Sequence, residues 1–150
     1  MFSKTCEYGI RATIFIASES YQDRRVGLKD IAQKIDSPEA FTAKILQILA
    51  RNKIVNSIKG VGGGFEIPKK KMKKIKLTQI VKAIDGDVVF TGCGLGLSKC
   101  SDEHPCPAHF KFETIRTELA TMLENTNLEE LALGVVSGTT FLRYPAQIKE

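Results

Sequence analysis

The first half of the chain alternates apolar patterns of helical spacing with short polar turns. Apolar residues recur at helical intervals over 3–19 and again over 28–35. A third pattern covers 38–52. Ser37 and Pro38 predict its start, since serine caps helices and proline suits the first helical position. A short helix, a polar turn and a longer helix occur both in helix-turn-helix DNA readers and in other three-helix domains.

The next segment has the pattern of a β-hairpin. Residues 54–58 and 65–67 read as strands around the glycine-rich stretch 59–64, and Pro68 ends the pair. Glycines allow the tip to adopt positive φ and to approach a partner closely. A phosphate-binding loop is excluded, because no helix opening with Lys-Ser/Thr follows these glycines. A hairpin directly after the third helix is typical of a winged helix.

The second half contains further helices around an irregular segment. Helical patterns cover 77–85, ended by Gly86, and about 107–124. Asn127 could cap a short last helix, and the tail after residue 133 has no readable period. We therefore expect a mostly α fold with a small β-hairpin wing, namely a winged helix-turn-helix domain plus a long dimerisation helix. The expected units are the winged domain 1–86, the cysteine-rich loop 87–108, the dimerisation helix with the short final helix 109–133, and the tail 134–150.

The helix over 107–124 carries a narrow apolar stripe formed by Phe112, Ile115, Leu119 and Met122. A narrow stripe on an otherwise polar helix resembles a coiled-coil seam. We expect a homodimer seam here, with packing of the helix on its own domain as the alternative.

Charge and composition narrow the class of protein. The 150 residues carry a net charge of +5, with six lysines between Lys69 and Lys76. Such a run is either a solvated surface or a nucleic-acid contact. Neither a signal peptide nor an apolar stretch of about 18–20 residues is visible, so we expect a cytoplasmic protein without a membrane span. The two histidines lie in no catalytic motif, so an enzyme is not expected.

Three of the four cysteines, Cys93, Cys100 and Cys106, lie within fourteen residues. Glycines and prolines around them indicate a loop, on which three thiols can converge on one metal or iron–sulfur cluster. A simple cluster takes four protein ligands, so one ligand must come from elsewhere. In the cytoplasm, clustered cysteines are more often metal ligands or redox thiols than disulfides. The remaining thiol, Cys6, is expected to be a small buried apolar side chain on the first helix.

Two other functions fit the cysteines. A winged-helix regulator could use them to bind zinc or as a thiol switch without any cluster. A protein of another class, which transfers electrons or carries clusters, could have a basic surface with no DNA-binding role.

Three short segments and the cysteines together carry a family resemblance. KTCEYGIRA at 4–12, GVGGGF at 60–65, LTQIVKAIDG at 77–86 and three cysteines before a long helix resemble the Rrf family of bacterial winged-helix regulators. The resemblance covers about residues 2–133 and is greatest to the IscR-like and NsrR-like iron–sulfur sensors. It implies a homodimer that binds palindromic double-stranded DNA and holds one cluster per subunit near the dimer interface.

The resemblance also implies ligands for that cluster. The three loop cysteines match the family cysteines, although the first gap is often one residue shorter in familiar members. A two-iron and a four-iron cluster both remain open, and an aerobic preparation can lose either. The fourth ligand is His109, as in IscR-like members, or Glu7 of the partner subunit, as in NsrR-like members. His104 is a third candidate without family support.

In a winged helix, the third helix reads the major groove and the wing reaches the flanking DNA. Ser37 at the helix cap could hold a phosphate. Ala40 and Ala43 cannot form the hydrogen bonds to base edges that polar side chains form at these positions in relatives, so the base preference should differ from theirs. The expected DNA-contacting residues are Ser37, Glu39, Thr42, Lys44, Gln47, Arg51, Lys59, Gly62, Gly63, Lys69 and Lys70.

Overall fold

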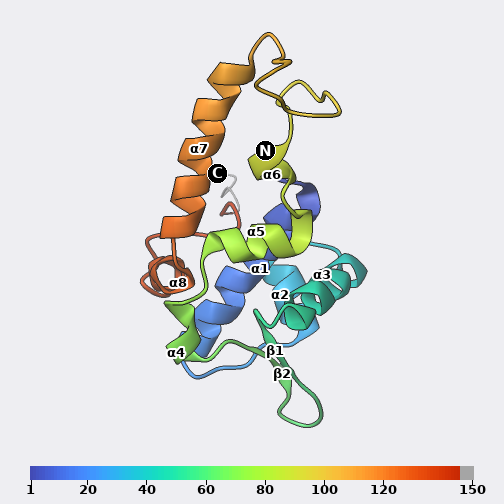
Figure 1. Cartoon of the computed structure of the whole chain (residues 1–150). Coiled ribbons are helices and arrows are strands. Elements are labelled where there is room, and N and C mark those ends of the chain that lie inside the picture. The colour runs from blue at the N-terminus through green and yellow to red at the C-terminus, as the bar shows by residue number, and fades with distance from the viewer. Residues whose placement is uncertain (146–150) are drawn as a thin grey trace, which may run out of the picture.

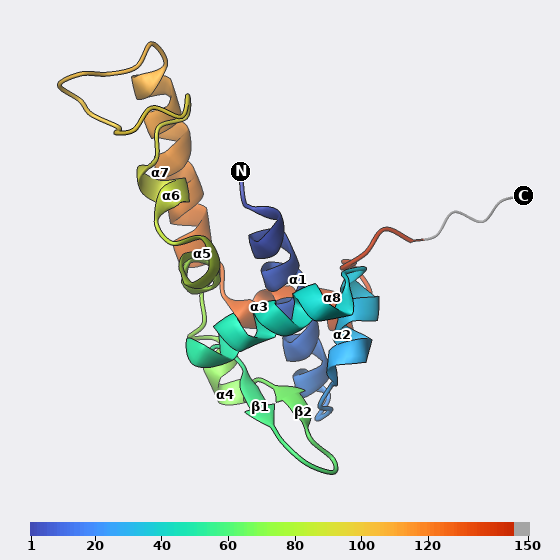
Figure 2. The same cartoon turned by 90° about the vertical axis from the view of Figure 1, so that its right-hand side faces the viewer.

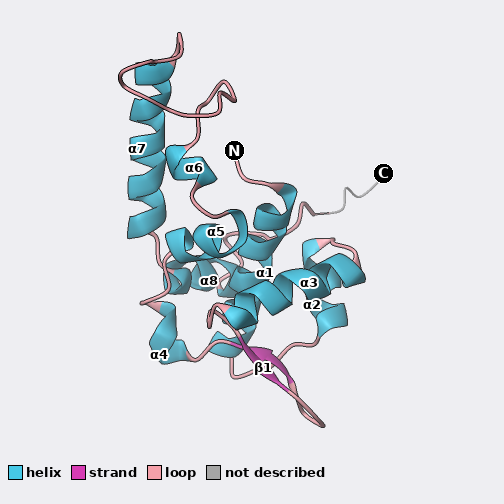
Figure 3. Ribbon diagram, turned by 45° about the vertical axis from the view of Figure 1, so that its right-hand side comes forward, coloured by secondary structure: helices cyan, strands magenta, loops and turns pink. Residues whose placement is uncertain are grey.

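Helices form most of the structure, which is a computed structural model that describes residues 1–145. Figures 1 and 3 show packed helices with one antiparallel hairpin projecting at one end. The elements are α1 (Lys4–Tyr21), α2 (Leu28–Ile35), α3 (Glu39–Arg51), β1 (Asn56–Ile58), β2 (Gly64–Glu66), α4 (Lys69–Met72), α5 (Leu77–Asp85), α6 (Val88–Thr91), α7 (His109–Asn125) and α8 (Leu128–Val136). This order confirms the predicted mostly α fold with a small β-hairpin wing.

The core forms around α1. Ser3 caps this helix, and its hydroxyl accepts a hydrogen bond from the Cys6 N–H at 3.0 Å. Side chains from the middle of α1 are buried against α2, α3, α5 and α8. One apolar cluster joins Ile16 of α1 to Ile31 of α2 and Leu49 of α3. The three-helix unit that the periodicity predicted is therefore held together by the first helix.

The start of α3 differs from the prediction. Pro38 takes the N-cap position, with φ −58° and ψ 138°, and its carbonyl accepts the first helical hydrogen bond from Thr42 N–H at 2.9 Å. Ser37 lies one residue before the cap, and its hydroxyl oxygen lies 3.0 Å from the Thr42 hydroxyl oxygen. The predicted Ser37 cap is thus wrong. Ile48 is only half-buried, while Leu46 is fully buried in the core.

The wing is shorter than the predicted hairpin. Its register pairs Asn56 with Glu66 and Ile58 with Gly64. Ile54 and Val55, predicted to begin the first strand, are instead buried in the core before β1 starts. Their apolar character reflects packing against the helices and not pairing in the sheet.

The remaining helices place the cysteine loop at one end of the molecule and the wing at the other. Figures 1 and 2 show α7 projecting from the core, with the loop beyond its N-terminal end. The helix α5 has the bounds that the sequence predicted, whereas α7 begins at His109. The four-residue helix α6 was not predicted. Of the helices in residues 1–145, none is long and apolar enough to cross a membrane.

The chain returns to the core after α7. Asn127 caps α8, as predicted, and its side chain accepts a hydrogen bond from Glu130 N–H at 3.0 Å. The helix α8 packs on α1. Beyond it, Leu142 enters the same core, and its carbonyl accepts a bond from Arg11 at 3.3 Å. Part of the unassigned tail is therefore packed structure, while residues 146–150 lie outside the described residues.

Replacement of Leu142 or of Phe141 by alanine should change the free energy of unfolding by very different amounts, although the two residues are neighbours in the tail. Leu142 is 7% exposed and Phe141 is 69% exposed. Leu142→Ala should lower the free energy of unfolding by about 2–5 kcal/mol, because it leaves a cavity in the core. Phe141→Ala should change it by less than about 0.5 kcal/mol. Urea unfolding of both variants measures this, and equal losses would contradict the observed packing.

Candidate functional site

The exposed face of α3 is the first candidate surface. Lys44, Gln47 and Arg51 are exposed along it, and Glu39 is exposed in the first turn. Spacings of three and four residues place Lys44, Gln47 and Arg51 on one side of the helix. These four side chains are available to DNA as the sequence predicted, although their role in binding stays a prediction.

Thr42 is not available on that surface. It is fully buried, and its hydroxyl donates to the Pro38 carbonyl at 2.8 Å. Burial follows from the helical register, which turns Thr42 toward the core between the neighbouring turns of α3. The expectation that Thr42 reads DNA is therefore wrong. Ser37, half-buried and bonded to Thr42, belongs to the same local hydrogen-bond pair.

The wing and the lysine run face each other across an open groove. Gly62 and Gly63 line one side of it, and Lys69 and Lys70 at the start of α4 line the other. Gly62 has φ +75°, a conformation that favours glycine. Lys59 is exposed near the tip of the hairpin. The structure thus gathers several of the predicted DNA-contacting residues at the wing end of the molecule.

At the other end, Cys93 and Cys106 form one pair of thiols. The pKa of the Cys93 thiol is lowered, chiefly by the nearby backbone N–H groups of Leu97 and Leu95 and less by the Cys106 side chain. Burial of Cys93 opposes it. N–H groups that converge on a sulfur stabilise the thiolate, which is the form that binds metals.

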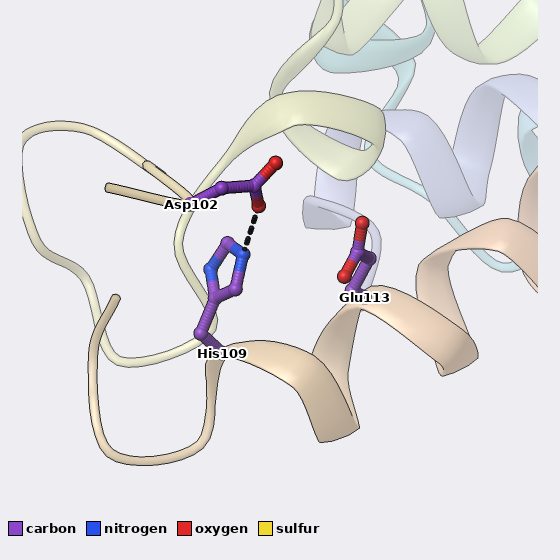
Figure 4. Close-up of side chains that lie close together, drawn as sticks. All are labelled: Asp102, His109 and Glu113. Atoms are coloured by element: carbon purple, nitrogen blue, oxygen red, sulfur yellow. Dashed lines mark hydrogen bonds and ion pairs between the residues drawn. The ribbon is translucent and has the colours of Figure 1, made fainter. Parts of the chain in front are cut away.

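Cys100 and His109 form the second pair. The Cys100 Sγ lies 3.3 Å from His109 Nδ1, and the imidazole is only 4% exposed. Figure 4 shows Asp102 facing the ring, with its Oδ1 2.6 Å from Nε2. Since a carboxylate accepts, Nε2 carries the proton, and Nδ1 is left free to accept or to bind a metal. Asp102, His109 and Glu113 also offer ligand atoms within 4.8 Å of one another.

Arg116 connects the two pairs. Its guanidinium donates to the Cys100 sulfur at 3.2 Å and also to the carbonyl of Gly92, the residue before Cys93. The loop also packs on α7 at Gly94, where an added Cβ would lie 2.5 Å from the Phe112 ring. The sequence reasoning missed Arg116. The sequence spacing could have revealed this residue, because Arg116 follows His109 by seven residues and therefore lies on the same face of α7.

The other candidate ligands make contacts that do not involve these sulfurs. Glu7 is on α1 and forms an ion pair with Lys4 at 3.3 Å. Both Figure 1 and Figure 2 show the start of α1 away from the loop beyond α7. His104 is exposed, and its N–H donates to the Ser101 hydroxyl. Within one chain, only His109 of these three lies beside a loop cysteine.

Comparison with known proteins identifies the family. The sequence profile of the Rrf2 family, whose description is iron-dependent transcriptional regulator, matches residues 2–133. The chain belongs to the Rrf2 family. A candidate helix-turn-helix transcriptional regulator of Aquifex aeolicus is 29% identical over 133 residues, which cover 87% of this chain and 90% of the relative. The transcriptional regulator IscR of Pectobacterium atrosepticum is 27% identical, over 83% of this chain and 74% of its own.

Solved structures of similar fold are regulators too. CymR, the global cysteine regulator of B. subtilis, has a TM-score of 0.71 at 23% identity, covering 89% of this chain and 96% of its own. IscR of T. potens has a TM-score of 0.69 at 16% identity, covering 93% and 91%. These likenesses confirm the winged-helix fold. Membership of the Rrf2 family confirms a transcriptional regulator, a class that is not enzymatic.

Cys6 behaves as an ordinary core residue of this Rrf2 protein. It is fully buried and packs with Val81 of α5 and Leu123 of α7. Burial, aided by the nearby Asp85 carboxylate, raises the pKa of its thiol to about 12. The expectation that Cys6 is a buried apolar side chain is confirmed.

The opposite pKa shifts of Cys93 and Cys6 predict selective alkylation of reduced, metal-free protein. Because its pKa is lowered, Cys93 forms thiolate at lower pH than an unperturbed cysteine thiol of pKa 9.0. Its rate of reaction with iodoacetamide should therefore rise with pH through a midpoint below that value. Cys6 should remain unmodified across the same range unless the protein unfolds. Peptide mass mapping measures both, and a Cys93 midpoint at or above the ordinary value would contradict the hydrogen-bonded geometry.

Proposed function

We propose that this Rrf2-family regulator binds operator DNA with an affinity set by an iron–sulfur cluster held in the cysteine loop. The observation that carries the proposal is the contact between Cys100 and the buried imidazole of His109 on the loop that also carries Cys93 and Cys106. Among the described residues the three sulfurs do not yet form one group of ligand atoms within 4.8 Å, so binding of a cluster would draw the loop together. Thiolate sulfurs with one nitrogen are a donor set that iron–sulfur clusters accept. The hydrogen bond that Arg116 donates to Cys100 fits the same role, since such bonds to ligand sulfur tune a cluster.

The residues that would hold the cluster are Cys93, Cys100 and Cys106, with His109 as the fourth ligand. Contact between His109 and Cys100 supports His109 over Glu7 of the partner subunit. Asp102 would orient the ring by accepting from Nε2–H, the arrangement usual for histidines that bind metals. A bound cluster would supply a centre that oxidants, nitric oxide or iron loss can alter. Its nitrogen ligand would bind iron less firmly than a thiolate.

A route from the loop to the reading helix exists in the packing. The helix α7 contacts α5, and α5 contacts both α1 and α3. Leu123 of α7 and Val81 of α5 are fully buried in one apolar cluster. A shift of α7 caused by rearrangement of the loop would therefore reach α3 through α5, which changes DNA affinity if the two loop states differ in binding.

We also propose a homodimer that binds palindromic DNA. Of the predicted apolar stripe on α7, Ile115 and Met122 are 56% and 46% exposed in the single chain. Phe112 packs at Gly94 and Leu119 packs on the cluster of Leu123, so half of the stripe contacts its own chain. Apolar exposure of this kind on one projecting helix fits a seam with a second copy. A cytoplasmic location belongs to the same proposal, because DNA and reduced thiols are both found there.

A second candidate is a regulator of the same family without a cluster. Three cysteines and one histidine are also a donor set for structural zinc. In addition, the lowered pKa of Cys93, to which the Cys106 side chain contributes, favours a thiol pair that an oxidant could join. A zinc-bound protein and a protein with a thiol switch would both be colourless when purified.

The visible spectrum of protein purified without oxygen separates the two candidates. With a cluster, we expect strong absorbance together with matching iron and sulfide, and Cys100→Ala should remove all three because it deletes a ligand. Cys6→Ala is the matched control, since it removes a thiol outside the loop and should keep the spectrum. Gel-shift titration with and without the cluster then tests whether it sets DNA affinity. A colourless protein that holds zinc, or that fails reconstitution, would favour the second candidate.

The fourth ligand can be assigned by comparing His109→Ala with Glu7→Gln. We expect His109→Ala to assemble less cluster and to lose iron faster in air, whereas Glu7→Gln should match the parent protein. Asp102→Asn should weaken iron retention by about 10-fold or more, the usual effect of losing a partner that orients a ligand. The measurement is bleaching of the visible band on exposure to air. Faster bleaching in Glu7→Gln alone would assign the carboxylate from the partner.

A further inference from the structure

Arg25, in the turn between α1 and α2, holds the wing at two points. Its Nη1 donates to the Gly62 carbonyl near the tip at 3.1 Å, and its Nε donates to Glu66 Oε2 on β2 at 3.0 Å. One planar guanidinium therefore bridges the turn of the hairpin and its second strand. The sequence reasoning assigned Arg25 no role, because nothing local links it to residues about forty positions away.

Val26, the residue after Arg25, also links the turn between α1 and α2 to the wing. Val26 and Phe65 exchange backbone hydrogen bonds of 3.2 and 2.8 Å, so the turn adds a short third edge to the two-stranded hairpin. A Cβ on Gly64 would lie 2.7 Å from the Val26 carbonyl oxygen, which shows how closely the two backbones approach. An isolated two-stranded hairpin is marginally stable in water. The position of the wing thus depends on residues 25 and 26.

We infer that Arg25 is a positioning residue for DNA recognition, which fixes the wing in its binding orientation before DNA arrives. The inference rests on the proposed DNA-binding role of the wing. The ion pair with Glu66 offsets the charge of Arg25, and two of its N–H groups are already used within the protein. A wing that is already ordered does not have to be immobilised on binding, so affinity is gained without a new contact.

The neighbouring arginine provides a matched comparison. Arg24 carries the same charge but pairs with Glu19 at 2.5 Å and with Gln22, both at the end of α1. It makes no bond to the hairpin among the described residues. Both arginines are exposed and line the groove between the wing and α4. Figure 2 shows the wing projecting beyond the helices. A simple loss of positive charge should affect both sites alike.

The test uses the full-length protein and a duplex that the parent protein selects from a random-sequence pool. Arg25→Ala should weaken binding to this duplex about 10-fold, as expected for ordering a few side chains and a loop. Arg24→Ala should change it by about twofold at most. Arg25→Lys keeps the charge, but a lysine cannot donate to the Gly62 carbonyl and to Glu66 at the same time. This variant should therefore bind nearly as weakly as Arg25→Ala. Thermal unfolding checks that all variants remain folded.

Two further readouts separate positioning from direct contact with phosphate. Amide hydrogen exchange in free Arg25→Ala should become faster at Phe65 and the wing, and the slope of log affinity against log salt should stay that of the parent. Glu66→Thr removes a negative charge yet should also weaken binding, because it frees Arg25.

A salt slope smaller by about 0.9 in Arg25→Ala, with tighter binding by Glu66→Thr, would overturn the inference in favour of a phosphate contact. Unchanged affinity in Arg25→Ala would also overturn it. A parent protein that selects no duplex would overturn the proposed DNA-binding function itself, and the positioning role with it.

Discussion

Burial of α1 is the constraint on which the rest of the structure depends. Its middle turns present Ala12, Ile16 and Ala17 to the core with no exposed surface, and α2, α3, α5 and α8 all pack on it. Gly9 lets α5 approach, since a Cβ there would lie 2.1 Å from the Ile84 side chain. The helices that carry the candidate DNA surface and those that lead to the cysteine loop therefore share one support. A disturbance at α1 would alter both ends of the molecule.

The two ends use the same physical device for different purposes. At the wing, Arg25 joins a backbone carbonyl and a carboxylate, and at the loop, Arg116 joins a backbone carbonyl and a thiol. Both segments are rich in glycine and have little apolar burial of their own. A planar group with several donors can order such a segment by spanning two points of it. Order in these irregular regions thus comes from charged hydrogen bonds to backbone, where the helices are ordered by apolar packing.

Much of the candidate site could be predicted from the sequence, and the reasons are local. Exposed positions of α3 follow from helical periodicity, and the three cysteines follow from their spacing on a loop. Thr42 shows the limit of this reasoning, because a polar side chain was taken to be exposed, whereas its hydroxyl is satisfied inside the helix by the Pro38 carbonyl. Ser37 fails for a similar reason, since a proline at the cap position displaced it from the helix end.

The sequence by itself determined the longer helices, the hairpin, the family and the set of candidate ligands, because side-chain periodicity, caps and motif spacing are encoded within a few residues. Only the tertiary structure decided which distant groups meet. Arg25 with Gly62, Arg116 with Cys100, His109 with Asp102 and Leu142 with the core all depend on the path of the chain between them. Such contacts are fixed by how the helices pack around α1, and no local pattern records that packing.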